Sequence, residues 1–317
     1  MKIDLSGTTK IATRDTYGNT LVEIGQEHPE LVVLDADLAG ATKTGTFKKS
    51  FPDRHIDCGI AEGNMMGIAA GLASCGKVPF ASSFAMFAAG RAYEQVRNSI
   101  AHANLNVKVA ATHAGISVGE DGATHQCIED LALMRVIPNM VVLNPADDVE
   151  ARAAIWAAFT YQGPVYIRLG RLAVPVIYDK EEYQFEMGKG VLLREGTDLT
   201  IIATGLEVYE SLMAAEQLAA DGISAEVINI HTIKPIDEEL LVKSVTKTGR
   251  AVTVEEHSVI GGLYGAVCET LAASVPVKVL GIGIQDRYGH SGNAKALLKE
   301  FGLDAEGICR KIKAFIR

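Results

Sequence analysis

The chain has 317 residues, enough for two domains that each bury a core, and carries a formal net charge of −9. It contains no cluster of basic residues, which argues against nucleic-acid binding because phosphate contacts need a footprint of lysine and arginine. Its apolar runs are of strand length and its start, MKIDLSGTTK, lacks the apolar core of a signal peptide, so we expect a cytoplasmic protein with no membrane role.

The first part of the chain, up to Glu62, predicts two helices and a strand, with acidic and small residues where these elements begin or end. Residues 14–30 predict a helix with Tyr17, Leu21 and Ile24 on one face, followed by the buried strand LVVLDADL. The next loop, AGATKTG, can hold an anion or merely turn. A further helical stripe begins just after Glu62, which in the simplest interpretation complements the helix dipole from the first turn.

The segment VPFASSFAMFAAGRAYEQVRN predicts a strand that runs into a helix. Phe84 and Phe87 stand at the helix entry, and two aromatic residues at this spacing are most often part of the core. The five cysteines are scattered and show neither C-x-x-C nor a Cys/His ligand spacing. They indicate reduced packing thiols and no metal site on this chain.

The stretch THAGISVGEDGATHQ, residues 112–126, is the most concentrated polar feature of the chain, and we call it the 112–126 loop. It follows the apolar run 107–111 and carries His113, Glu120, Asp121 and His125. Open parallel sheets place polar chemistry beyond the carboxyl edge in this way. Two histidines and an acidic pair offer proton transfer near neutral pH and acceptors for hydroxyl groups.

Strands and helices continue to alternate after this loop, which predicts a doubly wound, mainly parallel α/β sheet for residues 1–175. One helix within it is expected to bury the face formed by Val149, Ala153, Trp156 and Ala157. Arg168 and Arg171 follow the last strand, where a guanidinium can clamp a phosphate or stay exposed for solubility. With Arg14, Arg91 and Arg287, they are the candidate anion ligands of an acidic protein.

A second α/β alternation fills residues 198–317, and the polar, aperiodic residues 176–197 are expected to be the linker. Glu255, Glu256 and His257 end one of its strands. They can form a catalytic cluster, but carboxylates at a strand end more commonly cap the next helix.

The 112–126 loop resembles the pyrimidine-binding domain of transketolases, where the corresponding loop reads close to H-D-S-I-G-V-G-E-D-G-P-T-H-Q. The second half resembles the C-terminal domain of the same family through INIHTIKPID, TVEEHSVIGGLYGA and GIQDRYGHSG. The segment RAYEQVRN is closer to deoxyxylulose-phosphate synthases and pyruvate dehydrogenase beta subunits. The resemblance therefore implies a pyrimidine-binding domain over 1–175 and a smaller C-terminal domain over 198–317.

The resemblance also implies a site for thiamine diphosphate and a sugar phosphate. Glu62, in an I-x-E context, would hydrogen-bond the aminopyrimidine and promote its imino tautomer, in a site of low dielectric. The other implied cofactor contacts are Leu38 and the stacking rings Phe84 and Phe87; the implied second catalytic group is His125; the implied substrate ligands are Arg14, His113, Asp121 and Arg171. A third wall, a tyrosine in full-length transketolases, would fall at Gly90 or in a shifted register, and Ala41 or Thr42 replaces the family's phosphate-binding serine.

The chain lacks the family's diphosphate-binding domain, with its G-D-G motif and the asparagine that holds the cation. Because its first domain begins at its own methionine, we expect a split enzyme rather than a truncation. A separate N-terminal subunit would bind the diphosphate and Mg²⁺ or Ca²⁺, in an α2β2 heterotetramer.

The expected activity is ketol transfer from a ketose phosphate to an aldose phosphate, as in the pentose phosphate pathway. Three alternatives stay open on the sequence: half of a 1-deoxyxylulose-5-phosphate synthase, a 2-oxoacid dehydrogenase beta-like subunit, and a non-catalytic assembly partner that keeps the fold. The substrates also stay open among pentose phosphates, branched sugar phosphates and sulfonated sugars, since an arginine clamp accepts either anion.

Overall fold

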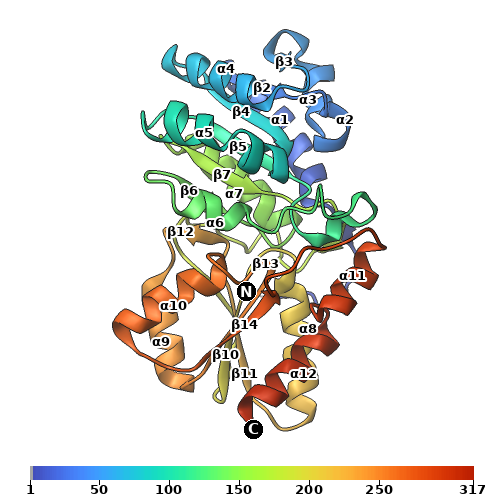
Figure 1. The fold of residues 1–317 in the computed structure, drawn as a ribbon, viewed down its shortest axis with the longest axis vertical. Coiled ribbons are helices and arrows are strands. Elements are labelled where there is room, and N and C mark those ends of the chain that lie inside the picture. Colours follow the sequence, from blue (N-terminus) through green and yellow to red (C-terminus); the bar gives the residue numbers. More distant parts are fainter. Residues whose placement is uncertain (1–2) are drawn as a thin grey trace.

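The computed structural model describes residues 3–317. Two sheets, each covered by helices, lie one after the other along the long axis of the molecule, and we call each sheet with its helices a layer (Figure 1). The first is built on a seven-stranded sheet in the order β12-β6-β7-β5-β4-β2-β3. All its strands except β12 run parallel; they are β2 (Leu31–Asp35), β3 (His55–Asp57), β4 (Val78–Phe84), β5 (Lys108–Thr112), β6 (Val141–Leu143), β7 (Val165–Arg168) and β12 (Thr232–Lys234). Its central strands β2, β4 and β5 are wholly buried, including the polar side chains of Ser82, Ser83 and Lys108.

Helices cover both faces of this sheet, which confirms the predicted doubly wound fold. One face packs against α1 (Thr13–Glu27), α3 (Thr44–Ser50) and α7 (Asp148–Thr160). The other packs against α4 (Glu62–Ser74), the segment formed by the π-helix η2 (Met86–Arg91), α5 (Tyr93–Gln95) and the π-helix η3 (Val96–Ala101), and α6 (Asp130–Arg135). Short turns join them: α2 (Ala39–Thr42) and the 3₁₀ helices η1 (Pro52–Arg54) and η4 (Ile116–Asp121).

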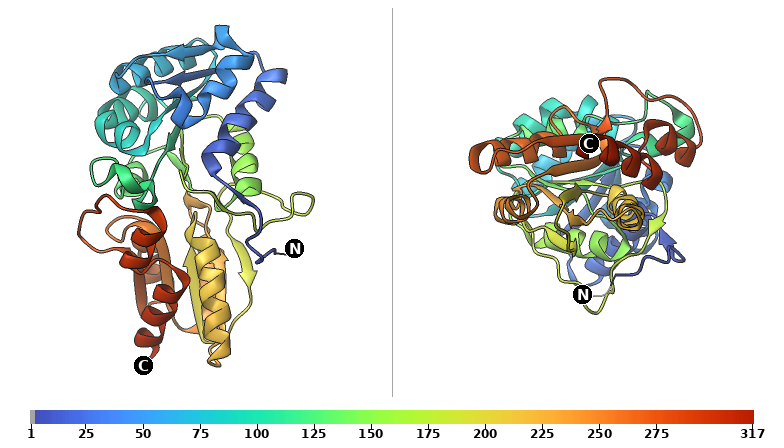
Figure 2. Two further views of the ribbon diagram at one scale, coloured as in Figure 1. Left: turned by 90° about the vertical axis from the view of Figure 1, so that its right-hand side faces the viewer. Right: turned by 90° about the horizontal axis from the view of Figure 1, so that it is seen from below.

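The second layer is a five-stranded sheet in the order β14-β13-β10-β11-β9. Its strands are β9 (Val191–Arg194), β10 (Leu199–Ala203), β11 (Ala225–Asn229), β13 (Ala251–Ser258) and β14 (Val279–Ile284), and β9 is antiparallel to β11. Helices α8 (Glu207–Ala220) and α12 (Ala305–Ile316) cover one face, and α9 (Glu238–Thr248) and α10 (Leu263–Ser274) cover the other, while α11 (Ala294–Phe301) lies at the junction with the first layer (Figures 1 and 2).

Several connections cross between the layers. The segment 232–234 leaves the second half of the chain and adds β12 to the first sheet beside β6. Strand β9 lies inside the aperiodic segment 176–197, and just before that segment β8 (Val174–Pro175) pairs with β1 (Lys10–Ile11).

The face predicted for α7 is wrong, because the helix buries Ala151, Ala154, Ile155 and Ala158 and leaves the expected residues half-buried.

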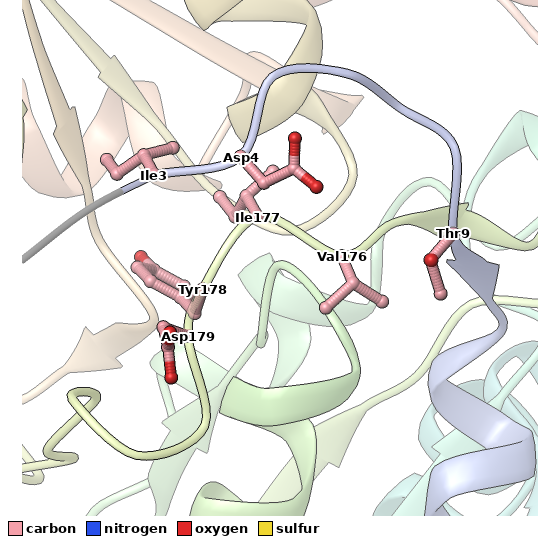
Figure 3. A pocket seen from close by; sticks show the side chains of 7 residues that line it. All are labelled: Ile3, Asp4, Thr9, Val176, Ile177, Tyr178 and Asp179. Atoms are coloured by element: carbon pink, nitrogen blue, oxygen red, sulfur yellow. The ribbon is translucent and has the colours of Figure 1, made fainter.

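A pocket of about 520 Å³ lies under the arch that residues 4–9 make over the chain at 176–179 (Figure 3). Two carboxylates, Asp4 and Asp179, line it, and among residues 3–317 no lysine or arginine side chain lines it. Within residues 3–317 no helix combines the length and the apolar character needed to cross a membrane.

Candidate active site

The predicted site residues gather at one edge of the first sheet. Strands β3, β2, β4, β5 and β7 are parallel neighbours in register, so their carboxyl ends face the same way. Glu62 follows β3, Leu38 follows β2, Phe84 ends β4, His113 follows β5 and Arg171 follows β7. This is the edge at which doubly wound sheets bind their ligands.

Four rings line this edge. Phe84 and Phe87 are nearly parallel, with centroids 6.0 Å apart and planes at 17°. The ring of His113 stacks on Phe84 at a centroid distance of 3.8 Å, and the ring of His125 lies at steep angles to those of Phe87 (5.3 Å, 76°) and Phe84 (6.2 Å, 66°). The two phenylalanines and both histidines therefore form one aromatic cluster.

His113 is held as a neutral hydrogen-bonding ring. Its Nε2 lies 3.0 Å from an Arg14 Nη1 and its Nδ1 lies 2.9 Å from the Thr112 hydroxyl. Burial, followed by the charges of Arg14 and Arg171, lowers its pKa to about 3. Nε2 therefore accepts from Arg14, and Nδ1 donates to Thr112. This differs from the expected near-neutral titration: His113 can orient groups but stays uncharged at physiological pH.

The two arginines predicted for the substrate lie next to this histidine. Arg14 donates to the Ala41 carbonyl at 3.1 Å as well as to His113, and its pKa is lowered by burial and by the nearby charge of Arg171. Arg171 is half-exposed and donates to the carboxylate of Glu120 at 2.8 Å. The Arg171 guanidinium holds the pKa of that carboxyl below its ordinary value. The edge thus carries two close cations, one of them already paired.

Glu62 is the first residue of α4 and is buried, with 1% of its side chain exposed. An Nη1 of Arg91 donates to both of its carboxylate oxygens, at 3.0 and 3.2 Å. The Arg91 guanidinium also lies over the Phe87 ring, 4.5 Å from its centroid. From the sequence Arg91 is one of five candidate anion ligands, whereas the structure pairs it with a carboxylate of this chain.

The remaining predicted residues lie closer to solvent. Asp121 ends η4 and is exposed, and His125 is half-buried with its Nδ1 2.9 Å from the Thr124 hydroxyl. Leu38 is half-buried at the start of α2, where its carbonyl accepts from the backbone N–H groups of that turn. Its neighbour Asp35 is buried and bound to His55 at 2.9 Å, so this acidic strand end is structural.

The second layer holds the 112–126 loop from below. Gln126 donates to the carbonyl oxygens of Gly119 at 3.2 Å and His290 at 2.9 Å, and the Gly292 N–H donates to Gly119 at 3.4 Å. The segment that leads into α11 consequently lies beside the loop (Figures 1 and 2). The motif GIQDRYGHSG is thus a support for the loop.

Glu255, Glu256 and His257 cap helices. Glu255 accepts from the first N–H groups of α10, at 2.6 and 2.8 Å; Glu256 accepts from the Ser117 N–H in η4; and His257 Nε2 accepts from Leu131 at 3.1 Å in α6. Burial raises the pKa of Glu255 to about 8 and of Glu256 to about 7, and lowers that of His257 to about 4. The structure therefore confirms the capping interpretation for Glu255, which caps the next helix, and shows that Glu256 and His257 cap helical turns earlier in the chain.

Gly115 and Arg168 connect residues 255–257 to the first layer. Gly115 has φ +81°, and a Cβ there would lie 2.2 Å from the Glu256 carboxyl carbon, so the close approach requires glycine. Arg168 is buried, paired with Asp130 at 2.9 Å and bonded to the Glu256 carbonyl at 2.9 Å. Arg168, the last residue of β7, thus joins the layers, whereas Arg171, which follows β7, reaches the candidate site.

Comparison with known proteins identifies the fold family. The family described as "Transketolase, pyrimidine binding domain" matches residues 9–176, and "Transketolase, C-terminal domain" matches residues 188–308. A putative transketolase C-terminal section from Methanocaldococcus jannaschii is 54% identical, over 98% of both chains. The chain belongs to the transketolase family.

Two further relatives are similarly complete. A 6-deoxy-6-sulfo-D-fructose transketolase subunit from a Clostridium species is 48% identical over 94% of this chain and 92% of its own. A solved structure, titled a split-gene transketolase and an inactive β4 tetramer, superposes with a TM-score of 0.89 at 53% identity, over 96% of this chain and 98% of its own. Human transketolase, at 37% identity, is matched over 97% of this chain and 49% of its own length. The chain therefore corresponds to the C-terminal half of a full-length transketolase.

Proposed function

We propose that this chain is the C-terminal subunit of a thiamine-diphosphate-dependent transketolase, which moves a two-carbon ketol unit from a ketose phosphate to an aldose phosphate. The observation that carries the proposal is the meeting, at one sheet edge, of a buried carboxylate, an aromatic cluster and two cations. The nearly full-length match to split transketolase chains supports it. These relatives do not favour a synthase, a dehydrogenase or a non-catalytic role.

The residues at this edge fit an aminopyrimidine ring. In the structure, a planar group with N–H donors already lies in that environment: the Arg91 guanidinium stacks on Phe87 and donates to Glu62. A flat heterocycle with a ring nitrogen requires the same two partners, an aromatic face and a desolvated carboxylate. We therefore assign Glu62, Phe84, Phe87 and Leu38 to the cofactor.

When bound, thiamine diphosphate supplies a nucleophilic thiazolium carbon for addition to a ketose carbonyl. The chain's own groups serve the steps around it. Glu62 holds the ring in a site of low dielectric, and His125, against Phe87, is placed to hydrogen-bond a reacting oxygen. Asp121, exposed on the same loop, is a candidate acceptor for a substrate hydroxyl.

Arg14, His113 and Arg171 are the proposed anion ligands. Arg14 and Arg171 are close enough to influence the same histidine, and a phosphate or sulfonate would satisfy both guanidinium groups. His113 contributes as a neutral ring that orients Arg14. Because Glu120 holds Arg171, the anion must compete with a carboxylate that is exposed to water.

The diphosphate and its Mg²⁺ or Ca²⁺ are assigned to a separate N-terminal subunit, in an α2β2 assembly. Two observations support this: the chain spans about half of human transketolase, and a related chain solved as a β4 tetramer is inactive. Among residues 3–317 there is no group of three or more histidine, cysteine or acidic side chains arranged to hold a metal ion. A cytoplasmic place in pentose phosphate metabolism accords with such an enzyme, although one relative is named for a sulfonated ketose.

The test is ketol transfer from xylulose 5-phosphate to ribose 5-phosphate, with this chain alone and with a co-expressed N-terminal subunit, Mg²⁺ and thiamine diphosphate. Activity only in the mixture supports the proposal. Release of carbon dioxide from pyruvate would instead identify a synthase or dehydrogenase. If the subunits associate and bind cofactor without transfer between these sugars, 6-deoxy-6-sulfofructose and branched ketose phosphates are the next donors to test.

A further inference from the structure

We propose that Arg91 is a positioning residue that holds Glu62 in the unloaded subunit and releases it when the cofactor ring binds. The proposal rests on the proposed function for the identity of the ring. Its basis is the double contact of Arg91, which donates to both Glu62 oxygens and covers the face of Phe87.

The backbone explains why an arginine reaches this place. Phe87 and Arg91 lie in η2, a π-helix, in which each turn accommodates one more residue than an α-helix turn. Gly90 has no side chain that could form the third wall, and the Met86 methyl group lies 2.2 Å from the position that its Cβ would take. The wider turn therefore brings Arg91 to Glu62 and Phe87, at the side where the sequence left the third wall undecided.

The guanidinium and a cofactor ring require the same two partners. Phe84 cannot serve as an alternative platform on its covered face, because His113 stacks there at 3.8 Å. Phe87 is half-buried and carries Arg91 over its ring. A heterocycle that stacks on that face of Phe87 and bonds Glu62 must displace the guanidinium. Arg91 is thus a placeholder that keeps a buried carboxylate paired until the ring replaces it.

The ion pair between Arg91 and Glu62 can also separate, because Arg91 is free to move into solvent. The Arg91 side chain is 53% exposed, whereas that of Glu62 is 1% exposed. Ion pairs and cation–π contacts of a partly exposed arginine are individually weak, and a long flexible side chain can turn into solvent. Glu62 cannot follow it, because it is buried at the first turn of α4.

The first experiment measures the pair in the chain alone. Thermal unfolding is compared for wild type, Arg91→Gln, Glu62→Gln and the double variant. We expect Arg91→Gln to lower Tm because it leaves a buried carboxylate unpaired, and to have a much smaller effect when Glu62 is already glutamine. Equal effects in both backgrounds would overturn the coupling. Arg152→Gln is the matched control, since Arg152 is 57% exposed and pairs with an exposed glutamate, Glu23, at 2.8 Å.

The second experiment measures the dissociation constant of thiamine diphosphate by calorimetry, on the complex with the N-terminal subunit at saturating Mg²⁺. If Arg91 occupies the site about nine-tenths of the time, Arg91→Gln should tighten binding about tenfold. Arg91→Lys, which keeps a cation for Glu62, should lie between the two, and Arg152→Gln should match wild type. A gain in affinity is a result that a merely structural role would not produce.

The outcomes separate the two proposals. A wild-type complex that binds no thiamine diphosphate overturns the proposed function, and the placeholder role with it. A wild-type complex that binds the cofactor, beside an Arg91→Gln complex that binds equally or more weakly, overturns the placeholder alone and makes Arg91 part of the loaded pocket.

Discussion

Two strand ends in this chain carry nearly the same chemistry and perform different work. The 112–126 loop follows β5 and residues 255–257 end β13, and each combines histidine with two carboxylates. At β13 every one of the three side chains is buried and accepts backbone N–H groups from the start of a helical turn. At β5 His113 is buried but meets the side chain of Arg14, while Glu120 and Asp121 are exposed and Glu120 pairs with the half-exposed Arg171.

The difference lies in whether the partners can be exchanged. A backbone N–H at a helix start cannot leave, so the group bound to it is a fixed cap. A half-exposed side chain such as Arg171 or Arg91 can turn away and give its place to a ligand. Composition therefore does not separate a site from a structural cluster; the mobility of the partner does.

The largest effect is expected at Glu62, on the sheet edge that we propose to carry catalysis. Glu62→Gln keeps the shape and can still accept from Arg91, so the fold should persist with little change in Tm. Turnover of the assembled enzyme should fall about 10²- to 10⁴-fold, because a carboxyl group positioned for proton transfer is lost. Steady-state assays at saturating cofactor test this, and a retained rate would remove Glu62 from the mechanism.

The next largest effect is expected at the buried ion pair between Asp130 and Arg168. Asp130→Ala leaves the buried Arg168 guanidinium without its carboxylate. The free energy of unfolding in urea should fall by about 3–5 kcal/mol, as for other broken buried ion pairs. Glu23→Ala removes an exposed carboxylate from the surface pair with Arg152 and should cost less than about 1 kcal/mol. Similar losses in both variants would contradict the assignment.

A smaller effect is expected in the pH dependence of stability. The pKa of Glu256 is about 7 in the fold, above the ordinary 4.5, so the folded state binds more protons between these values. Its contribution is complete below pH 4.5 and is lost as pH rises through 7, amounting to about 3 kcal/mol at most.

The difference in unfolding free energy between wild type and Glu256→Gln isolates this contribution from the opposite trend of His257, whose pKa is lowered. Wild type should lose stability relative to the variant between pH 5 and pH 8. A difference that stays constant over this range would show that Glu256 does not titrate there.

The smallest effect is expected at Arg171, where a bound anion would take the place of the Glu120 carboxylate. Arg171→Gln should raise KM for the phosphorylated acceptor about tenfold with little change in kcat, since one charged ligand is lost from ground and transition state alike. Glu120→Gln removes the charged partner of the same guanidinium, which keeps its bond to the Val118 carbonyl, and should leave KM equal or lower it. A rise of KM in both variants would mean that the pair, rather than the arginine, binds the anion.

Much of this architecture could be predicted because apolar patterns report burial directly. The mainly apolar strands β2, β4 and β5 and the stripe of Tyr17, Leu21 and Ile24 are buried as expected. The exceptions are elements whose partner lies far away in the chain: β12 is three residues long and joins the opposite sheet, and β9 is an antiparallel edge strand in a polar segment. Short strands carry too little periodic signal to be recognised alone.

The candidate site divides in the same way. Residues 112–126, Glu62, Phe84 and Phe87 could be named from the sequence, because strand ends and helix starts fix their place at the sheet edge. Their partners could not. The contact between Arg91 and Glu62 depends on a π-helix that shifts the register, and the neutral state of His113 depends on burial beside two arginines.

The sequence by itself thus determined the alternation of strands and helices and the sheet edge that bears the polar chemistry. Those features follow from local patterns, which are independent of how the layers dock. The tertiary structure alone decided which carboxylates cap helices, which arginine pairs with Glu62 and which one joins the layers. Those choices depend on distance and burial, and both are set only when segments far apart in the chain pack together.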